Sequence, residues 1–165
     1  MEEANTPAQE GHLLRFTYPY IPCPTIYGVV ERPYVPIRLE GRTSSVRYLA
    51  VVDSGADRSM VPLQTARLLG LPISKSSQRR TRGIGGEIVV VQSLVKLTMV
   101  QGANQLTFDR LVVDIPIKNV VMPLLLGREG FLEHFTVCLH PRGCVTLDTE
   151  PDQRLTRVRN PSGDP

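Results

Sequence analysis

The chain has 165 residues, which is long enough for one compact domain with a hydrophobic core, and its 41% hydrophobic and 21% charged residues lie in the ordinary globular range. Its longest apolar runs fall far short of the roughly 18 residues of a membrane span, and its net charge of +3 neither requires nor excludes an acidic partner. The 14 prolines and 13 glycines indicate many short turns, which favours a β-rich protein over a helical bundle.

Both ends of the chain have the composition of tails. Residues 1–11 are polar, contain a proline and show no periodicity, so we expect them to be disordered. The acidic start has no apolar stretch behind it and does not match a signal peptide, which predicts a soluble, cytoplasmic protein without membrane contact. A second polar tail is expected at residues 150–165, which leaves residues 12–149 as a single domain.

The first half of the domain contains strand patterns that lead to an aspartate. The prolines within residues 19–36 restrict any strands there to sheet edges. Further along, Val35, Ile37 and Leu39 alternate with polar residues, which is the period of a half-buried strand. The next strand forms a hairpin with this one and ends at Asp53. The strands expected in this half are residues 13–20, 34–40 and 46–52.

The second half contains a helix pattern, a glycine-rich turn and several strand patterns. Pro62 and Gly70 are typical boundaries of a helix over residues 63–69. The segment Gly83-Ile84-Gly85-Gly86 lies between two strand-like arms and indicates the tip of a hairpin. Further strands are expected at residues 88–97, 105–115 and 120–126, the last buried on both faces, then a short helix at 131–135 and a closing hairpin of 137–139 with 144–147.

The residue types that commonly bind metals are scattered along the chain. The three cysteines lack Cys-x-x-Cys spacing, and the three histidines share no ligand spacing, so we expect neither a metal nor a cofactor. A disulfide between Cys138 and Cys144 across the intervening turn stays open as an alternative, while reduced cysteines are favoured in a cytoplasmic protein.

Asp53 is the candidate catalytic residue. It ends an apolar strand, and the chain turns at once through Ser54 and Gly55. A carboxylate in such a place is costly unless its charge is used or its proton is shared. These three residue types also favour ordinary turns, so the motif gains its weight from a second, distant motif, Gly127-Arg128, which follows another apolar strand.

The order of these motifs resembles the retropepsin-like aspartic protease family, whose best-known members are the retroviral proteases. The resemblance joins Asp53-Ser54-Gly55-Ala56 to Leu124-Leu125-Leu126-Gly127-Arg128, covers roughly residues 33–148, and is closest in character to bacterial chromosomal members. It implies an all-β fold: one closed β-barrel with a short C-terminal helix and a glycine-tipped flap hairpin. It also implies an endopeptidase that hydrolyses an extended protein segment.

The resemblance further implies a homodimer, because the mechanism needs two aspartates and the chain has one such motif. Two carboxylates about 3 Å apart cannot both ionise, so the two copies of Asp53 would share a proton and activate a water. Asp57 would pair with Arg128. The implied loop-supporting residues are Ser54, Gly55, Ala56, Asp57 and Arg128, and the implied substrate or flap residues are Arg58, Gly83, Ile84, Gly85 and Gly86.

Two residues depart from the pattern of the family. Glu129 follows Gly127-Arg128 where viral members usually carry Asp or Asn, which leaves the detail of the dimer contact open. Arg58 replaces an acid of some viral members and could favour acidic side chains in the substrate. The terminal strands of viral dimers have no clear counterpart, and residues 13–32 or 144–156 could replace them.

Two other functions compete with proteolysis. A protease-like fold could serve as a catalytically silent dimerisation or peptide-binding module, although the intact Asp53 motif argues against this. The cluster Arg79, Arg80 and Arg82 could bind nucleic acid, but no broad basic stripe with aromatic residues accompanies it. We expect these arginines to be solvated and the partners to be a second copy and a peptide or protein substrate.

Overall fold

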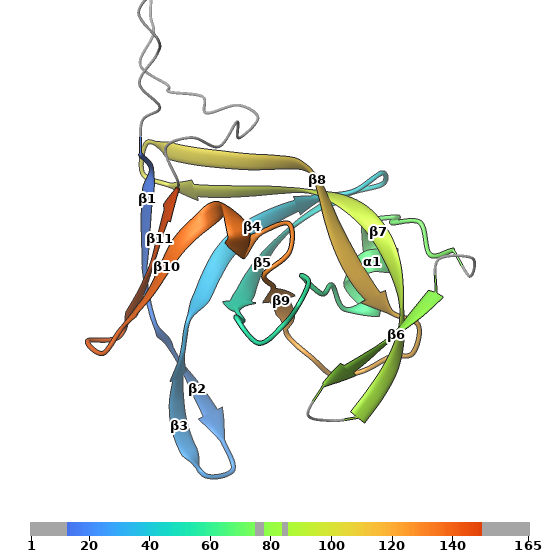
Figure 1. The fold of residues 1–165 in the computed structure, drawn as a ribbon, viewed down its shortest axis with the longest axis horizontal. Coiled ribbons are helices and arrows are strands. Elements are labelled where there is room, and N and C mark those ends of the chain that lie inside the picture. The colour runs from blue at the N-terminus through green and yellow to red at the C-terminus, as the bar shows by residue number, and fades with distance from the viewer. Residues whose placement is uncertain (1–12, 75–77, 84–85, 150–165) are drawn as a thin grey trace, which may run out of the picture.

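The computed structural model describes residues 13–74, 78–83 and 86–149 as a strand-dominated, all-β fold (Figure 1). The two expected tails lie outside these residues. The strands are β1 (Arg15–Pro19), β2 (Ile21–Thr25), β3 (Gly28–Arg32), β4 (Tyr34–Glu40), β5 (Ser45–Val52), β6 (Gln78–Gly83), β7 (Gly86–Gln101), β8 (Asn104–Pro116), β9 (Leu124–Leu126), β10 (Phe135–His140) and β11 (Cys144–Thr149). The helical elements are α1 (Leu63–Leu68) and the 3₁₀ turn η2 (Leu132–His134).

The strands form three sheets. The largest has the order β6-β7-β4-β5-β9, with β8 also paired to β7, and a second has the order β1-β11-β10. Among the described strands, β2 and β3 pair only with each other, so Pro22 and Pro24 lie in a two-stranded ribbon with free edges, as the sequence predicts. The closed barrel implied by the resemblance is not found among the described strands, because no pairing joins β6 to β9.

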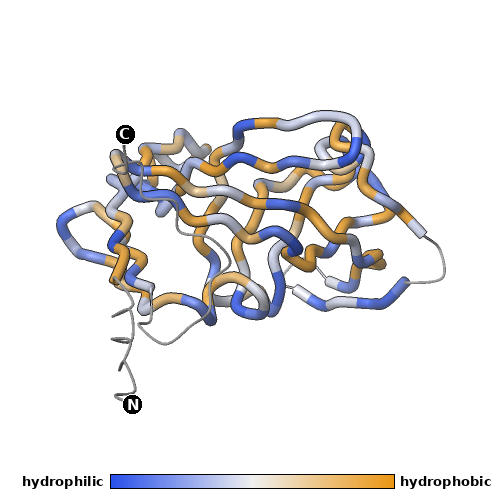
Figure 2. Tube along the Cα trace, turned by 90° about the horizontal axis from the view of Figure 1, so that it is seen from above, coloured by the Kyte–Doolittle hydropathy of each residue, from blue (hydrophilic) through white to orange (hydrophobic). Residues whose placement is uncertain are grey.

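The predicted hairpin before Asp53 is confirmed and forms the centre of the large sheet. Val35, Ile37 and Leu39 of β4 are buried while their neighbours are exposed, because side chains on a strand alternate between its two faces. Strand β4 pairs antiparallel with β5 from Tyr34↔Val51 to Glu40↔Ser45. Strand β5 shows the same two-residue period in its burial, and hydrophilic and hydrophobic residues are interspersed along the chain (Figure 2).

One hydrophobic core lies between the large sheet and the β1-β11-β10 sheet. Phe16 of β1 and Phe131 are completely buried in it. Phe131 lies 5.2 Å from both Phe108 and Phe135, measured between ring centroids, which are ordinary distances for tilted aromatic pairs. These aromatic residues are contacts within the core.

Two predicted elements are much shorter than expected. Of residues 120–126 only Leu124–Leu126 form a strand, and Val121 is fully exposed. Pro123 cannot donate a hydrogen bond to a strand ladder, which explains why the pairing starts after it. The expected helix at residues 131–135 is the single turn η2, because Phe135 already has extended backbone and begins β10.

The other elements match their patterns more closely. Helix α1 follows Pro62, and Gly70 after it has a φ of +64°, a conformation typical of residues that end helices. Strand β7 extends beyond the predicted residues 88–97 and has a register shift between Val95 and Leu97. Cys23, Cys138 and Cys144 are free of disulfides. None of the helices in the described part of the chain is long and apolar enough to cross a membrane.

Candidate active site

The parallel pairing of β5 with β9 places the two sequence motifs side by side. The register is Ala50↔Leu124, Val51↔Leu125 and Val52↔Leu126, so both strands end together. Asp53 continues this ladder by donating its backbone N–H to the carbonyl of Leu126 at 3.0 Å. The sequence pattern could not supply this register, which depends on a contact between segments about seventy residues apart.

The loop after β5 folds back on the Asp53 carboxylate. The Gly55 N–H donates to Asp53 Oδ1 at 2.9 Å, and the Ala56 N–H donates to the Asp53 carbonyl at 3.2 Å. A Cβ atom at position 55 would lie 3.2 Å from Asp53 Oδ1, which is a tight contact, so glycine suits this turn. Asp53 is partly buried and Ser54 is exposed. The carboxylate is therefore oriented by the backbone of its own loop and remains accessible.

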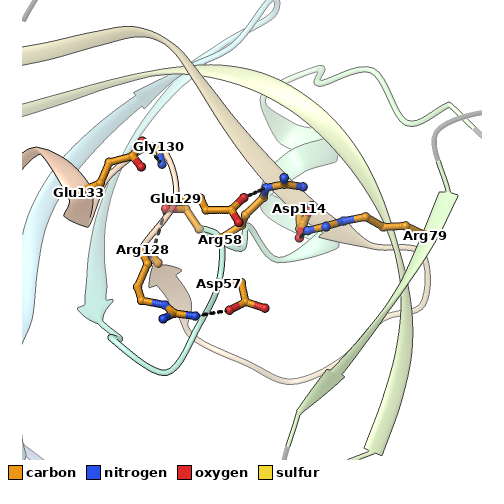
Figure 3. Close-up of polar contacts among 10 residues, drawn as sticks. Asp57, Arg58, Arg79, Asp114, Arg128, Glu129, Gly130 and Glu133 are labelled. Carbon is orange, nitrogen blue, oxygen red and sulfur yellow. Dashed lines mark hydrogen bonds and ion pairs between the residues drawn. The ribbon is translucent and has the colours of Figure 1, made fainter.

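Two backbone hydrogen bonds tie this loop to the segment after β9. The Arg128 N–H donates to the Ala56 carbonyl at 2.9 Å, and the Glu129 N–H donates to the Asp57 carbonyl at 2.7 Å. The side chains add an ion pair, in which Arg128 Nη2 lies 2.5 Å from Asp57 Oδ1 (Figure 3). The structure thus brings together the two residues expected to pair. Both side chains are more than half exposed.

A second ion pair lies beside the first. Arg58 Nε lies 2.6 Å from Glu129 Oε2, and the two residues also form an isolated parallel β-bridge (Figure 3). The guanidinium of Arg58, expected to bind substrate, is therefore engaged by Glu129 in this structure. Its attraction for acidic substrate side chains stays a prediction.

Gly127 is where the two segments approach most closely. A Cβ atom there would lie 2.3 Å from the carbonyl carbon of Arg58, which no side chain tolerates. The Gly127 N–H donates to Ser59 Oγ at 3.1 Å, and Ser59 is almost completely buried. Sequence reasoning missed Ser59, because a single serine after a turn has no distinguishing pattern.

Sequence reasoning also missed a buried ion pair between β6 and β8. Asp114 is 2% exposed, and its Oδ2 contacts Arg79 Nη2 (Figure 3). The Asp114 N–H donates to the Ser59 carbonyl and the Asp114 carbonyl accepts from the Val61 N–H, each at 2.9 Å. Arg79 therefore contacts a residue whose backbone is hydrogen-bonded to Ser59 and Val61, in the segment that follows the Asp53 loop. The sequence signal was present: a carboxylate inside an apolar strand needs a partner.

This pairing changes the interpretation of the basic cluster. Arg79 is an ion-pair partner of a buried acid and is not simply solvated. Its neighbour Arg80 lies 3.1 Å from Glu87 across the same hairpin, and that pair is largely exposed. Two of the three arginines are thus paired with acids.

The two strands of the predicted glycine-rich hairpin are β6 and β7. Strand β6 pairs with β7 up to Gly83↔Gly86, and Gly86 has a φ of +105°, a conformation that favours glycine. Ile84 and Gly85, the other two residues of the expected flap, lie outside the described residues. Within the described ranges, no group of three or more His, Cys, Asp or Glu side chains is placed to hold a metal ion.

Comparisons with known proteins identify the family of this chain. The family model described as aspartyl protease matches residues 35–129, which is more than half of the chain and includes both motifs. No curated protein matches the sequence at a significant level.

A solved structure shows the same fold. The crystal structure of a retropepsin-like aspartic protease from Rickettsia conorii superposes with a TM-score of 0.51 and 14% sequence identity, over 87% of this chain and 98% of that chain. The chain therefore belongs to the aspartyl protease family and has the fold of its retropepsin-like members.

Proposed function

We propose that this chain is an aspartic endopeptidase that works as a homodimer and hydrolyses peptide bonds in an extended polypeptide segment. The observation that carries the proposal is the Asp53 loop: an accessible carboxylate at the end of β5, oriented by the Gly55 N–H and attached to β9 by the Leu126 carbonyl. The match to the aspartyl protease family model supports peptidase chemistry in general.

The chemistry requires a second carboxylate. Two aspartates that face each other titrate as a pair and hold one proton over a wide pH range. The ionised member then removes a proton from a water, while the protonated member polarises the scissile carbonyl. The described residues contain one loop of this kind, so a second copy related by a two-fold axis supplies the other Asp53.

The surrounding residues have supporting roles in this proposal. Ser54 is exposed next to Asp53 and is available to bond across the two-fold axis. The ion pair Asp57–Arg128 and the backbone bonds around Ala56 hold the loop to the segment after β9. The β6–β7 hairpin, with the predicted flap residues Gly83, Ile84, Gly85 and Gly86, covers the bound peptide and excludes water.

A peptide-library digest with wild type and Asp53→Asn tests the proposal. We expect the substitution to reduce cleavage by about 10³-fold or more while circular dichroism and sedimentation stay unchanged, because only the acid–base group is lost. Asp109→Asn, on the exposed face of β8, is the matched control and keeps full activity. Full activity in Asp53→Asn would refute the proposal, and an inactive wild type would favour a silent peptide-binding or dimerisation module.

Mixing the two proteins tests whether each copy supplies one aspartate. An equal mixture of wild type and Asp53→Asn, left to exchange subunits, should show about a quarter of the wild-type activity, because about a quarter of the dimers then hold two intact aspartates. A monomeric enzyme would show about half. The mixture therefore distinguishes a shared site from two independent sites.

A further inference from the structure

The β2–β3 hairpin, residues 21–32, stands apart from the rest of the fold. Its two strands pair from Ile21↔Arg32 to Thr25↔Gly28 and with no other strand of the described residues. Four of the five residues of β3 are exposed. An isolated two-stranded ribbon is marginally stable in water unless it packs against something. In Figure 1 the hairpin extends from the body of the molecule, at the bottom of the view.

The surface of this hairpin is strongly apolar. Ile26 is 90% exposed and Tyr27 is 93% exposed at its tip, and Val29 and Val30 are 68% and 48% exposed on β3. Residues 21–30 contain no charged side chain. Exposed apolar side chains gathered on a projecting element are typical of protein interfaces, whose cores are depleted of charge and rich in aromatic residues.

The root of the hairpin is fixed next to the candidate catalytic residue. The carbonyl of Pro33, which follows β3, accepts the N–H of Val52 at 3.0 Å, and Val52 immediately precedes Asp53. On the other side, the Tyr20 N–H donates to the Gly143 carbonyl at 2.7 Å. Figure 1 shows the hairpin projecting on the side of the molecule where the loop after β5 lies.

We propose that the β2–β3 hairpin docks on a second copy of this chain and forms part of the dimer contact. This inference rests on the proposed function, in which a second Asp53 approaches the first. The base of the hairpin is hydrogen-bonded to Val52, the residue before Asp53, and the hairpin projects to the same side of the molecule as the loop after β5. It therefore contacts the subunit that supplies the second Asp53. In a two-fold dimer each hairpin contacts the other subunit, so the apolar patch is buried twice. A stable interface buries roughly 800 Å² on each partner, and the exposed apolar side chains of the two hairpins contribute part of it.

A variant with a single tryptophan at the hairpin tip tests the docking directly, because the chain contains no tryptophan. In Tyr27→Trp we expect the emission maximum to move to shorter wavelength, and acrylamide quenching to fall, over the protein concentrations at which sedimentation equilibrium shows the dimer forming. Val100→Trp is the control: Val100 is 53% exposed near the end of β7, and its substitute should stay accessible at every concentration. A dimer of Tyr27→Trp in which the introduced indole stays accessible overturns the inference.

A disruptive variant gives an independent result. In Ile26→Asp/Tyr27→Asp we expect an unchanged circular dichroism spectrum and a dimer dissociation constant at least about 100-fold higher, because two buried apolar side chains become charged. Peptide cleavage should fall at low protein concentration and return at high concentration. An unchanged dissociation constant overturns the inference.

The two proposals fail in distinguishable ways. If the protein cleaves as a dimer while the indole of Tyr27→Trp stays accessible, the hairpin inference is wrong and the proposed function stands. If that indole is buried in a dimer that cleaves nothing, the hairpin inference stands and the proposed function is wrong. A chain that stays monomeric at every concentration overturns both the docking and the homodimeric mechanism.

Discussion

The buried ion pair between Arg79 and Asp114 gives the sharpest stability prediction. Arg79→Met removes the guanidinium and keeps an unbranched apolar stem of similar length. The Asp114 side chain is 3% exposed, and its Oδ1 has no hydrogen-bond partner among the described residues, so the contact of Oδ2 with Arg79 is the main compensation for burying this carboxylate. The substitution leaves a buried charge without a cation.

The size of the effect follows from the exposure of the two partners. Removing one member of a fully buried ion pair costs about 3–5 kcal/mol, whereas an exposed pair contributes about 0–1 kcal/mol. Because the Arg79 side chain is 37% exposed, solvent already screens part of the interaction. We therefore expect Arg79→Met to lower the free energy of unfolding by about 2–3 kcal/mol, below the value for a fully buried pair.

Arg80→Met is a control on the neighbouring residue of the same strand. Arg80 pairs with Glu87, and these side chains are 76% and 43% exposed, so the loss should stay below about 1 kcal/mol. Urea unfolding followed by circular dichroism, at one fixed protein concentration, measures both variants without confusing folding with dimerisation. If Arg79→Met costs no more than Arg80→Met, the reasoning from burial is wrong.

A double variant checks the mechanism. Arg79→Met/Asp114→Leu replaces both charges with apolar groups, and such replacements of buried pairs are often neutral or stabilising. We expect it to recover most of the stability lost in Arg79→Met. A double variant as unstable as the single one would show that the arginine acts through packing, not through the charge of Asp114.

Two further substitutions test single contacts. Gly127→Ala places a Cβ 2.3 Å from the Arg58 carbonyl carbon, so we expect the free energy of unfolding in urea to fall by about 2–3 kcal/mol and cleavage to be lost. In the control Gly83→Ala the added Cβ meets nothing within 4 Å, and stability should change by less than about 0.5 kcal/mol. Equal effects would contradict the close approach at Gly127. Tyr18→Phe removes a buried hydroxyl that has no partner among the described residues, and should raise stability by about 1 kcal/mol at neutral pH. Burial raises the pKa of Tyr18 from 10.0 to about 12, so the folded state holds the phenolic proton more tightly than the unfolded state. The contribution of this proton to the free energy of unfolding is complete below pH 10.0 and is lost as pH rises toward 12. Urea unfolding across this range should show that alkaline loss in the wild type and not in Tyr18→Phe, and parallel profiles would contradict it.

Local patterns in the sequence were sufficient for the strands around the site. Alternation of Val35, Ile37 and Leu39 predicts β4 because neighbouring side chains on a strand face opposite sides. Pro62 and Gly70 predict α1 because proline suits the start of a helix and glycine suits the position just after its end. The same local information is wrong for residues 120–126, where an apolar run predicts one buried strand although only its last three residues form a strand.

Pairing between distant segments could not be derived from periodicity. Strands β5 and β9 pair in parallel within the large sheet, and their register places the Asp53 N–H against the carbonyl of Leu126. The partners of Arg58 and Arg79 were missed for the same reason, because a charged residue in a sequence shows its charge and not its neighbour. The pairing of Asp57 with Arg128 was expected from the family resemblance and not from spacing.

Local sequence patterns identify the candidate residues: the Asp53-Ser54-Gly55 turn, the Gly127-Arg128 motif and the glycine-rich hairpin. These are local features, set by which residues tolerate a turn or a close backbone approach. How these residues are held depends on long-range contacts, namely the parallel β5–β9 pairing and the ion pair of Arg58 with Glu129. The exposure of the apolar β2–β3 hairpin likewise follows from the packing of the fold. Those contacts join residues far apart in the chain, and their energy depends on burial, which exists only once the strands have packed.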